Sequence, residues 1–127
     1  MSGRVVHFEI PYDDGERAGV FYSEVFGWEI VEMPEMGYTM VTSGPSGDEG
    51  PTELGFINGG MMRREAPFAA PNLVIDVESI DDALKAVNQA GGQTVSEREA
   101  VGEMGFAAYV RDTEGNLVGL WESPPQG

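Results

Sequence analysis

The chain has 127 residues, of which 41% are hydrophobic and 23% charged, as expected for one globular domain and not for a disordered tail. It carries 22 Asp and Glu against 7 Lys and Arg, so its formal net charge is -15. A surface of that charge repels nucleic acid and anionic membranes, so we exclude both as main partners. The absence of cysteine excludes disulfides, thiolate metal sites and cysteine nucleophiles.

The composition also bears on location. No apolar run approaches the roughly 18 residues of a transmembrane helix, and the start of the chain lacks the layout of a signal peptide. We therefore expect a cytoplasmic protein. Lys85 is the only lysine. Few lysines among many carboxylates favour a halophilic protein, because salt screens the repulsion between like charges. The alternative is an ordinary acidic bacterial protein.

The first half of the chain predicts a strand, a helix and three more strands. Val6, Phe8 and Ile10 alternate with other residues, as in a strand with one buried face. Apolar residues then recur at helical spacing up to Gly27, a natural end for a helix. The later strands are expected over residues 28–33, 38–42 and 53–58, with a polar loop over 43–52 and a linker over 63–70.

The second half repeats this plan. We expect strands over residues 72–77, 93–97, 106–111 and 117–122, with a helix between Ser79 and Gly91. A constant offset of 65 residues relates the halves, as in the pairs His7 and Asn72, Ile10 and Ile75, Ala18 and Ala83, Gly27 and Gly92, and Ile30 and Val95. The repeat predicts two βαβββ modules, about 4–62 and 71–123, within one α+β domain of residues 1–127. We expect a curved eight-stranded mixed sheet with a concave cavity and helices on its convex side.

Three segments carry a family resemblance. They are the strand His7-Phe8-Glu9-Ile10 with residues 14–28, the strand and helix of residues 74–92, and residues 111–122, where an Asp-x-x-Gly-Asn turn precedes a strand ending in Glu. In this order they resemble the vicinal oxygen chelate superfamily, which includes glyoxalase, bleomycin-resistance and extradiol-dioxygenase proteins. The resemblance covers residues 5–122. It implies the glyoxalase-like fold and a homodimer, with modules paired within one chain or swapped between chains.

The resemblance also implies metal-ligand positions. In metal-dependent members, ligands come from the first, fourth, fifth and eighth strands, which here offer His7, Gly60, Asn72 and Glu122. His7 and Glu122 match the pattern, whereas Gly60 and Asn72 depart from it. A divalent metal usually has three or more protein ligands. Two alternatives therefore stay open, namely one divalent metal held by His7 and Glu122, or no cofactor.

We interpret the concave face as a site for a small molecule. His7, the only histidine, and Glu122 are the candidate catalytic residues. The candidate substrate-binding residues combine apolar and polar groups, as small-molecule sites do, and are Glu9, Phe56, Asn58, Asn72, Val74 and Leu120. The alternative is purely structural, with His7 an inert hydrogen-bonded residue, Glu122 a solvated strand end and Glu9 an edge residue in solvent.

Two functions from different classes follow. The resemblance implies a glyoxalase-like enzyme, with metal-assisted isomerase, lyase or dioxygenase chemistry on a substrate with adjacent oxygens. The alternative is a metal-free protein of the bleomycin-resistance type that binds or sequesters a small molecule. A metal-free acid–base enzyme that uses Glu122 or Glu9 is a third hypothesis. One fold hosts many chemistries, so the site must decide between them.

Overall fold

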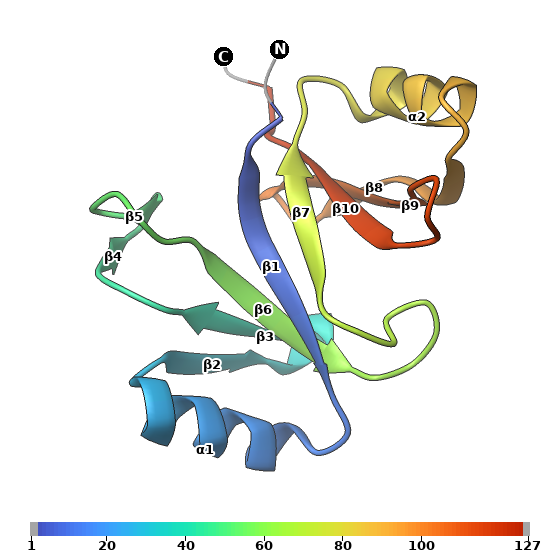
Figure 1. Ribbon diagram of the computed structural model, residues 1–127. Helices are drawn as coiled ribbons and strands as arrows, with labels where there is room; N and C mark the ends of the chain where they lie inside the picture. The colour runs from blue at the N-terminus through green and yellow to red at the C-terminus, as the bar shows by residue number, and fades with distance from the viewer. Residues whose placement is uncertain (1–2, 126–127) are drawn as a thin grey trace. The chain divides into compact units, whose positions relative to one another are not determined.

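The computed structural model describes residues 3–125, which divide into two compact units. We call residues 7–71 the N-terminal unit, and the described residues from 72 onward, together with residues 3–6, the C-terminal unit. Each unit contributes four long strands and one α-helix, and each contains parallel and antiparallel strand pairs (Figure 1). The predicted α+β class, with eight strands in two βαβββ units, is confirmed.

The N-terminal unit orders its strands β2-β3-β6-β1 (Figure 1). These strands are β1 (Val5–Tyr12), β2 (Glu29–Met33), β3 (Tyr38–Thr42) and β6 (Asn58–Arg63), and a short 3-10 helix (Pro34–Met36) joins β2 to β3. The helix α1 (Gly15–Phe26) begins at Asp14, whose side chain accepts the N–H of Arg17 at 3.0 Å. It ends at Gly27, which adopts the left-handed conformation (φ 72°) that glycine accepts most easily.

Helix α1 covers one face of this unit's sheet. Phe8 of β1 lies 5.5 Å from Trp28 between ring centroids, and Trp28 stacks on Tyr22 of α1 at 4.8 Å. Successive residues of a strand point to opposite faces, so His7 and Glu9 point away from α1. We call the sheet face that carries these two residues the His7 face.

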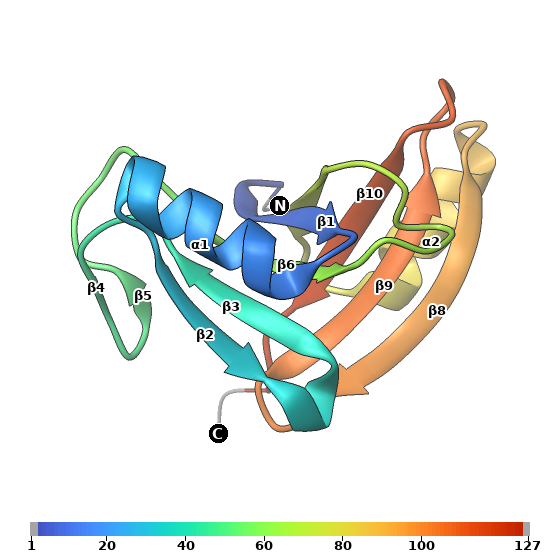
Figure 2. The ribbon, with the colours of Figure 1, turned by 90° about the horizontal axis from the view of Figure 1, so that it is seen from below.

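The C-terminal unit orders its strands β7-β10-β9-β8. Their bounds are β7 (Asn72–Asp76), β8 (Gln93–Val101), β9 (Gly105–Arg111) and β10 (Leu117–Glu122). The helix α2 (Ile80–Gln89) begins at Ser79, whose hydroxyl accepts the N–H of Asp82. Figure 2 shows β10, β9 and β8 side by side, and α2 contacts all three strands.

The core of this unit lies between α2 and the sheet. Its buried residues are Ile80 and Leu84 of α2, Ala108 and Val110 of β9, and Leu120 of β10. Leu120 is therefore part of this core, with 5% of its surface exposed. The face of β10 that carries Leu120 is the face toward α2.

The structure corrects the predicted fourth strand. That strand was expected over residues 53–58, but β6 begins at Asn58 and runs through Gly59 and Gly60. A Cβ at Gly59 would lie 2.5 Å from the Phe8 ring, and a Cβ at Gly60 would overlap the Tyr38 ring. Glycine therefore fits where two aromatic rings lie against the strand, although it lowers strand propensity.

Two smaller differences concern length and loops. The strand predicted over residues 93–97 extends to Val101 as β8. The predicted polar loop contains a small hairpin, β4 (Ser46–Gly47) and β5 (Gly50–Pro51). Within residues 3–125, no helix combines the length and the apolar character that a membrane crossing requires.

Candidate functional site

Three polar side chains meet on the His7 face of the N-terminal unit. The Tyr38 hydroxyl lies 2.7 Å from Nε2 of His7 and donates a hydrogen bond to Oε2 of Glu9 at 3.0 Å. The imidazole and phenol rings stack with their centroids 6.3 Å apart. Glu9 is only 4% exposed, so its carboxyl group depends on partners supplied by the protein. The sequence predicted His7 and Glu9 on one face, and Tyr38 joins them.

Hydrogen-bond counting assigns the donors. A phenol has one proton, so a Tyr38 hydroxyl that donates to Glu9 accepts from His7. His7 is then protonated at Nε2, and its Nδ1 carries a lone pair. Nδ1 has no hydrogen-bond partner among residues 3–125. This nitrogen is the atom of the cluster left available to a ligand.

Gly60 makes room for this arrangement. In the parallel pairing of β1 with β6, Gly60 lies beside Glu9, and in the antiparallel pairing of β3 with β6 it lies beside Met40. Because Gly60 has no side chain, the Tyr38 ring occupies the space above it. A glycine within a strand, close to an aromatic residue on the neighbouring strand, is the only signal that could have pointed to this contact, and the predicted fourth strand ended before Gly60.

Burial sets the charge state of His7. Desolvation lowers the pKa of the imidazole below its usual 6.5, and the Glu9 carboxylate opposes this only in part. His7 is therefore neutral at pH 7. A neutral imidazole with a free nitrogen can accept a hydrogen bond or a proton from a ligand.

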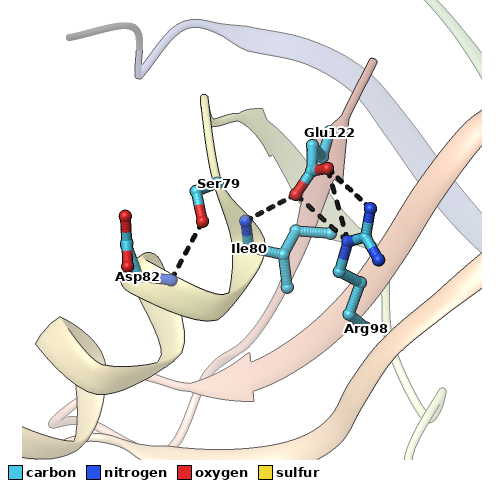
Figure 3. Close-up of polar contacts among 5 residues, drawn as sticks. All are labelled: Ser79, Ile80, Asp82, Arg98 and Glu122. Atoms are coloured by element: carbon cyan, nitrogen blue, oxygen red, sulfur yellow. Dashed lines mark hydrogen bonds and ion pairs between the residues drawn. The ribbon is translucent and has the colours of Figure 1, made fainter. Parts of the chain in front are cut away.

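Glu122, the second candidate catalytic residue, lies in the C-terminal unit at the start of α2 (Figure 3). Its Oε1 accepts the backbone N–H of Ile80 at 2.8 Å, and Arg98 lies 2.9 Å from its Oε2. The Arg98 guanidinium also stacks over the Phe106 ring, 3.6 Å from its centroid. The hydrogen bond from Arg98 is the main reason why the pKa of Glu122 is lowered, and the Ile80 N–H adds to it.

This position corrects the prediction that Glu122 and Leu120 face a cavity. Because side chains alternate along β10, Leu120 and Glu122 lie on the same face of the sheet, the one toward α2. Leu120 packs in the core there, and Glu122 lies at the N-terminus of α2, the positive end of the helix dipole. Apolar residues on both faces of β10 made the choice of face ambiguous in the sequence. Because Arg98 and Ile80 engage both carboxylate oxygens, a metal would have to displace them.

The remaining candidates have identifiable surroundings. Asn58 accepts the N–H of Ser43 at 2.9 Å and donates to the Ser46 hydroxyl, so it ties a loop to the start of β6. Phe56 precedes β6, contrary to its predicted place within the fourth strand. Its ring lies against Gly44, where an added Cβ would be 2.7 Å from Cζ.

Asn72 and Val74 lie on β7 of the C-terminal unit. Their neighbour Ile75 packs against the core beneath α2, so Asn72 and Val74 point away from that helix. Both are buried. Neither polar atom of the Asn72 side chain has a hydrogen-bond partner among residues 3–125.

Strand register revises the proposed ligand positions. Gly60 pairs with Glu9, and Gly119 pairs with Val74. Glu9 and Val74 are equivalent in the 65-residue repeat, so the residue equivalent to Gly60 is Gly119 and not Glu122. The implied ligand positions are thus His7, Gly60, Asn72 and Gly119, of which only His7 offers a good donor.

The side chains present do not fit a metal. At Gly60 the space for a ligand side chain holds the Tyr38 ring. At Gly119 an added Cβ would lie 3.1 Å from Cε1 of Tyr109. Among the residues that the structure describes, no three His, Asp or Glu side chains are grouped so that they could hold a metal ion.

Comparisons with known proteins agree with this fold. A family model described as bleomycin resistance protein-like N-terminal matches residues 4–44. A glyoxylase-like domain-containing protein from Didymella fabae is 29% identical over 127 residues, which cover 98% of this chain and 97% of the relative.

Two solved structures are similar over nearly the whole chain. A glyoxalase/bleomycin resistance protein/dioxygenase superfamily member from Vibrio splendidus 12B01 has a TM-score of 0.64 at 18% identity, covering 97% of this chain and 100% of that one. A variant of Streptomyces coelicolor methylmalonyl-CoA epimerase, in complex with 2-nitronate-propionyl-CoA, has a TM-score of 0.67 at 14% identity, covering 98% and 100%. These matches confirm the resemblance: the chain is similar to bleomycin-resistance-like and glyoxylase-like proteins, and the solved structures share its fold.

Proposed function

We propose that this chain binds a small organic molecule against the His7 face of the N-terminal unit, and that His7 serves there as a general base without a metal. The observation that carries the proposal is that Nδ1 of His7 has no hydrogen-bond partner among the described residues, while the other ring nitrogen is bonded to Tyr38. The lowered pKa of His7 supports the proposal, because the neutral imidazole, which can accept a proton, is then the main form at neutral pH.

The chemistry of the base indicates the class of substrate. A neutral imidazole removes a proton from a hydroxyl, or from a carbon made acidic by a neighbouring carbonyl. The structurally similar epimerase bears the name of such a reaction, since epimerisation at carbon removes a proton and returns it. We carry over the reaction type only. A net charge of -15 disfavours polyanionic ligands such as CoA esters, so a neutral or cationic carbon acid is the better substrate class.

Metal-assisted chemistry was the other enzymatic hypothesis. The residues at the implied ligand positions do not fit a divalent ion, because Gly60 and Gly119 have no side chain to offer and the Glu122 carboxylate already bonds to Arg98 and Ile80. We therefore route no step through a metal. Of the two roles that the sequence suggested for His7, metal ligand and catalytic residue, the proposal keeps the second.

Solvent exchange tests the base directly. Ethyl 2-methylacetoacetate, a neutral carbon acid, and methylmalonyl-CoA, an anionic one, are incubated with the protein in D2O and EDTA, and loss of the acidic C–H signal is followed by proton NMR. We expect faster exchange of the neutral probe, lowered about 100-fold in His7→Gln. Tyr22→Phe, which alters a tyrosine that stacks on Trp28, is the matched control. Exchange that requires added divalent metal, or no acceleration of either probe together with no shift of the His7 imidazole signal, contradicts the proposal.

A second function has its own supporting observation. Three of the four implied ligand positions lack a good donor, and the matching family model is of the bleomycin-resistance type. A metal-free binding or sequestering protein would bind the neutral probe at His7 without exchanging its proton. Shifts of the sole histidine signal without exchange would therefore favour this function.

The cytoplasmic location, the adaptation to high salt and the homodimer stay predictions from composition and resemblance.

A further inference from the structure

We infer that Tyr38 and Glu9 form a proton relay with His7, so that a proton accepted at Nδ1 of His7 is stored on the Glu9 carboxylate. The inference rests on the proposed function of His7 as a base and names the groups that make it one. Tyr38 and Glu9 act through His7 and are positioning residues. The sequence patterns assigned no role to Tyr38.

The geometry supplies a continuous path. Nε2 of His7 lies 2.7 Å from the Tyr38 oxygen, and that oxygen lies 3.0 Å from Oε2 of Glu9. Both distances are those of hydrogen bonds along which a proton can move. Glu9 is almost fully buried, while His7 is only partly buried, so the path leads from the ring to a carboxylate shielded from water.

The proton count balances without a co-reactant. In the resting state Glu9 is a carboxylate, Tyr38 donates to it, and His7 donates from Nε2. When Nδ1 takes a proton from the ligand, the Nε2 proton passes to the Tyr38 oxygen and the Tyr38 proton passes to Glu9. The result is a neutral Glu9, a neutral Tyr38 and a neutral His7 protonated at Nδ1, with the electron pair of the broken bond left on the ligand. Returning the proton reverses each shift.

The relay removes an electrostatic obstacle. A lone base in this position would become an imidazolium, and partial burial disfavours that cation. With the relay, the imidazole changes tautomer and gains no charge. The charge that disappears is the one on Glu9, whose side chain is almost fully buried.

The single histidine makes the resting state measurable without a ligand. Long-range proton–nitrogen NMR of the ¹⁵N-labelled chain reports which imidazole nitrogen carries the proton, and only one ring contributes. We expect the wild type at neutral pH to be entirely in the Nε2–H tautomer, with that ring proton slowed in its exchange with water. Tyr38→Phe keeps a ring above Gly60 but removes the hydroxyl, so it should give a tautomer mixture with a fast-exchanging ring proton. Tyr22→Phe should match the wild type.

Two results overturn the relay. One is a wild-type Nδ1–H tautomer, which would leave no lone pair for the ligand. The other is an identical tautomer distribution in the wild type and a folded Tyr38→Phe variant, with folding checked by circular dichroism. Glu9→Gln removes the carboxylate that accepts the proton, so it should lower the exchange rate of the neutral probe at least about tenfold. Substitution of an exposed glutamate, Glu32→Gln, should leave that rate unchanged.

These outcomes separate the relay from the proposed function. The tautomer is read in the ligand-free chain, so it does not depend on the choice of probe. An Nε2–H tautomer with no probe exchange contradicts the base function alone. Probe exchange that falls in His7→Gln but not in Glu9→Gln contradicts the relay alone.

Discussion

Gly60→Ala is the substitution that tests most sharply how Tyr38 is held. The added Cβ would overlap the Tyr38 hydroxyl oxygen, Cζ and Cε2. Gly60 does not have a positive φ, so its backbone accepts alanine without strain. At a compatible site, Gly→Ala stabilises by about 0.4–1 kcal/mol through the unfolded chain. Overpacking costs about 1–3 kcal/mol, and a displaced Tyr38 loses two hydrogen bonds of about 0.5–1.5 kcal/mol each. We expect a net loss of about 2–3 kcal/mol in the free energy of unfolding, measured by urea titration.

Gly119→Ala in the C-terminal unit is the matched control. Gly119 is also a strand glycine without a positive φ, and its added Cβ would lie 3.0 Å from Cγ2 of Val74 and 3.1 Å from Cε1 of Tyr109. These neighbours can shift by a few tenths of an ångström, so the loss should stay below about 1 kcal/mol.

A double-mutant cycle isolates the clash. If the Tyr38 ring is the obstacle, Gly60→Ala should cost little in a Tyr38→Ala background, and the two substitutions should show a coupling energy of about 1–3 kcal/mol. Equal losses for Gly60→Ala and Gly119→Ala, or no coupling with Tyr38, would refute the packing argument and with it the role assigned to Gly60.

Three further predictions concern charge and burial. The pKa of Glu122 is lowered in the fold, so its stabilising effect is present above the unfolded value near 4.5 and is lost as the pH falls through the folded pKa. Glu122→Gln should therefore lower the urea midpoint at pH 7 and have less effect at pH 3, and an equal effect at both would contradict the pairing with Arg98. Asn72→Leu should raise the free energy of unfolding by about 1 kcal/mol, because it removes buried polar atoms that have no partner among residues 3–125, and a loss in the urea titration would show that the amide has a partner or ligand. Glu9→Gln should lower the pKa of His7 further, since the carboxylate opposes the effect of burial, and an unchanged NMR titration of the imidazole would count against their contact.

The fold was predictable because its signals repeat. The constant offset of 65 residues and the cap residues Asp14 and Ser79 located both helices and the order of elements. The fourth strand was misplaced because Phe56 and Ile57 look more strand-like than a glycine pair. The position of β6 is set by contacts between strands, since Phe8 and Tyr38 require those glycines, and such contacts leave no trace in local propensity.

The candidate site was predictable in part for the same reason. Alternation along β1 placed His7 and Glu9 on one face correctly. It failed at Glu122, because β10 is apolar on both faces and only the packing of Leu120 beneath α2 decides which way the carboxylate points. Tyr38 was missed because its side chain extends from β3 over Gly60 of β6 to residues of β1, which is not adjacent to β3 in the sheet. The alternation of residues along a strand cannot predict a contact across an intervening strand.

The most direct test of a metal-free site is a metal titration followed at the sole histidine. The chain is purified without a His-tag, and Zn²⁺, Ni²⁺ and Mn²⁺ are titrated in separate calorimetric experiments, with the His7 imidazole signal followed by NMR. We predict no binding step at one equivalent and no selective loss or shift of the His7 signal. One ion bound per chain, and lost in His7→Ala, would contradict the account and return His7 to the role of a metal ligand.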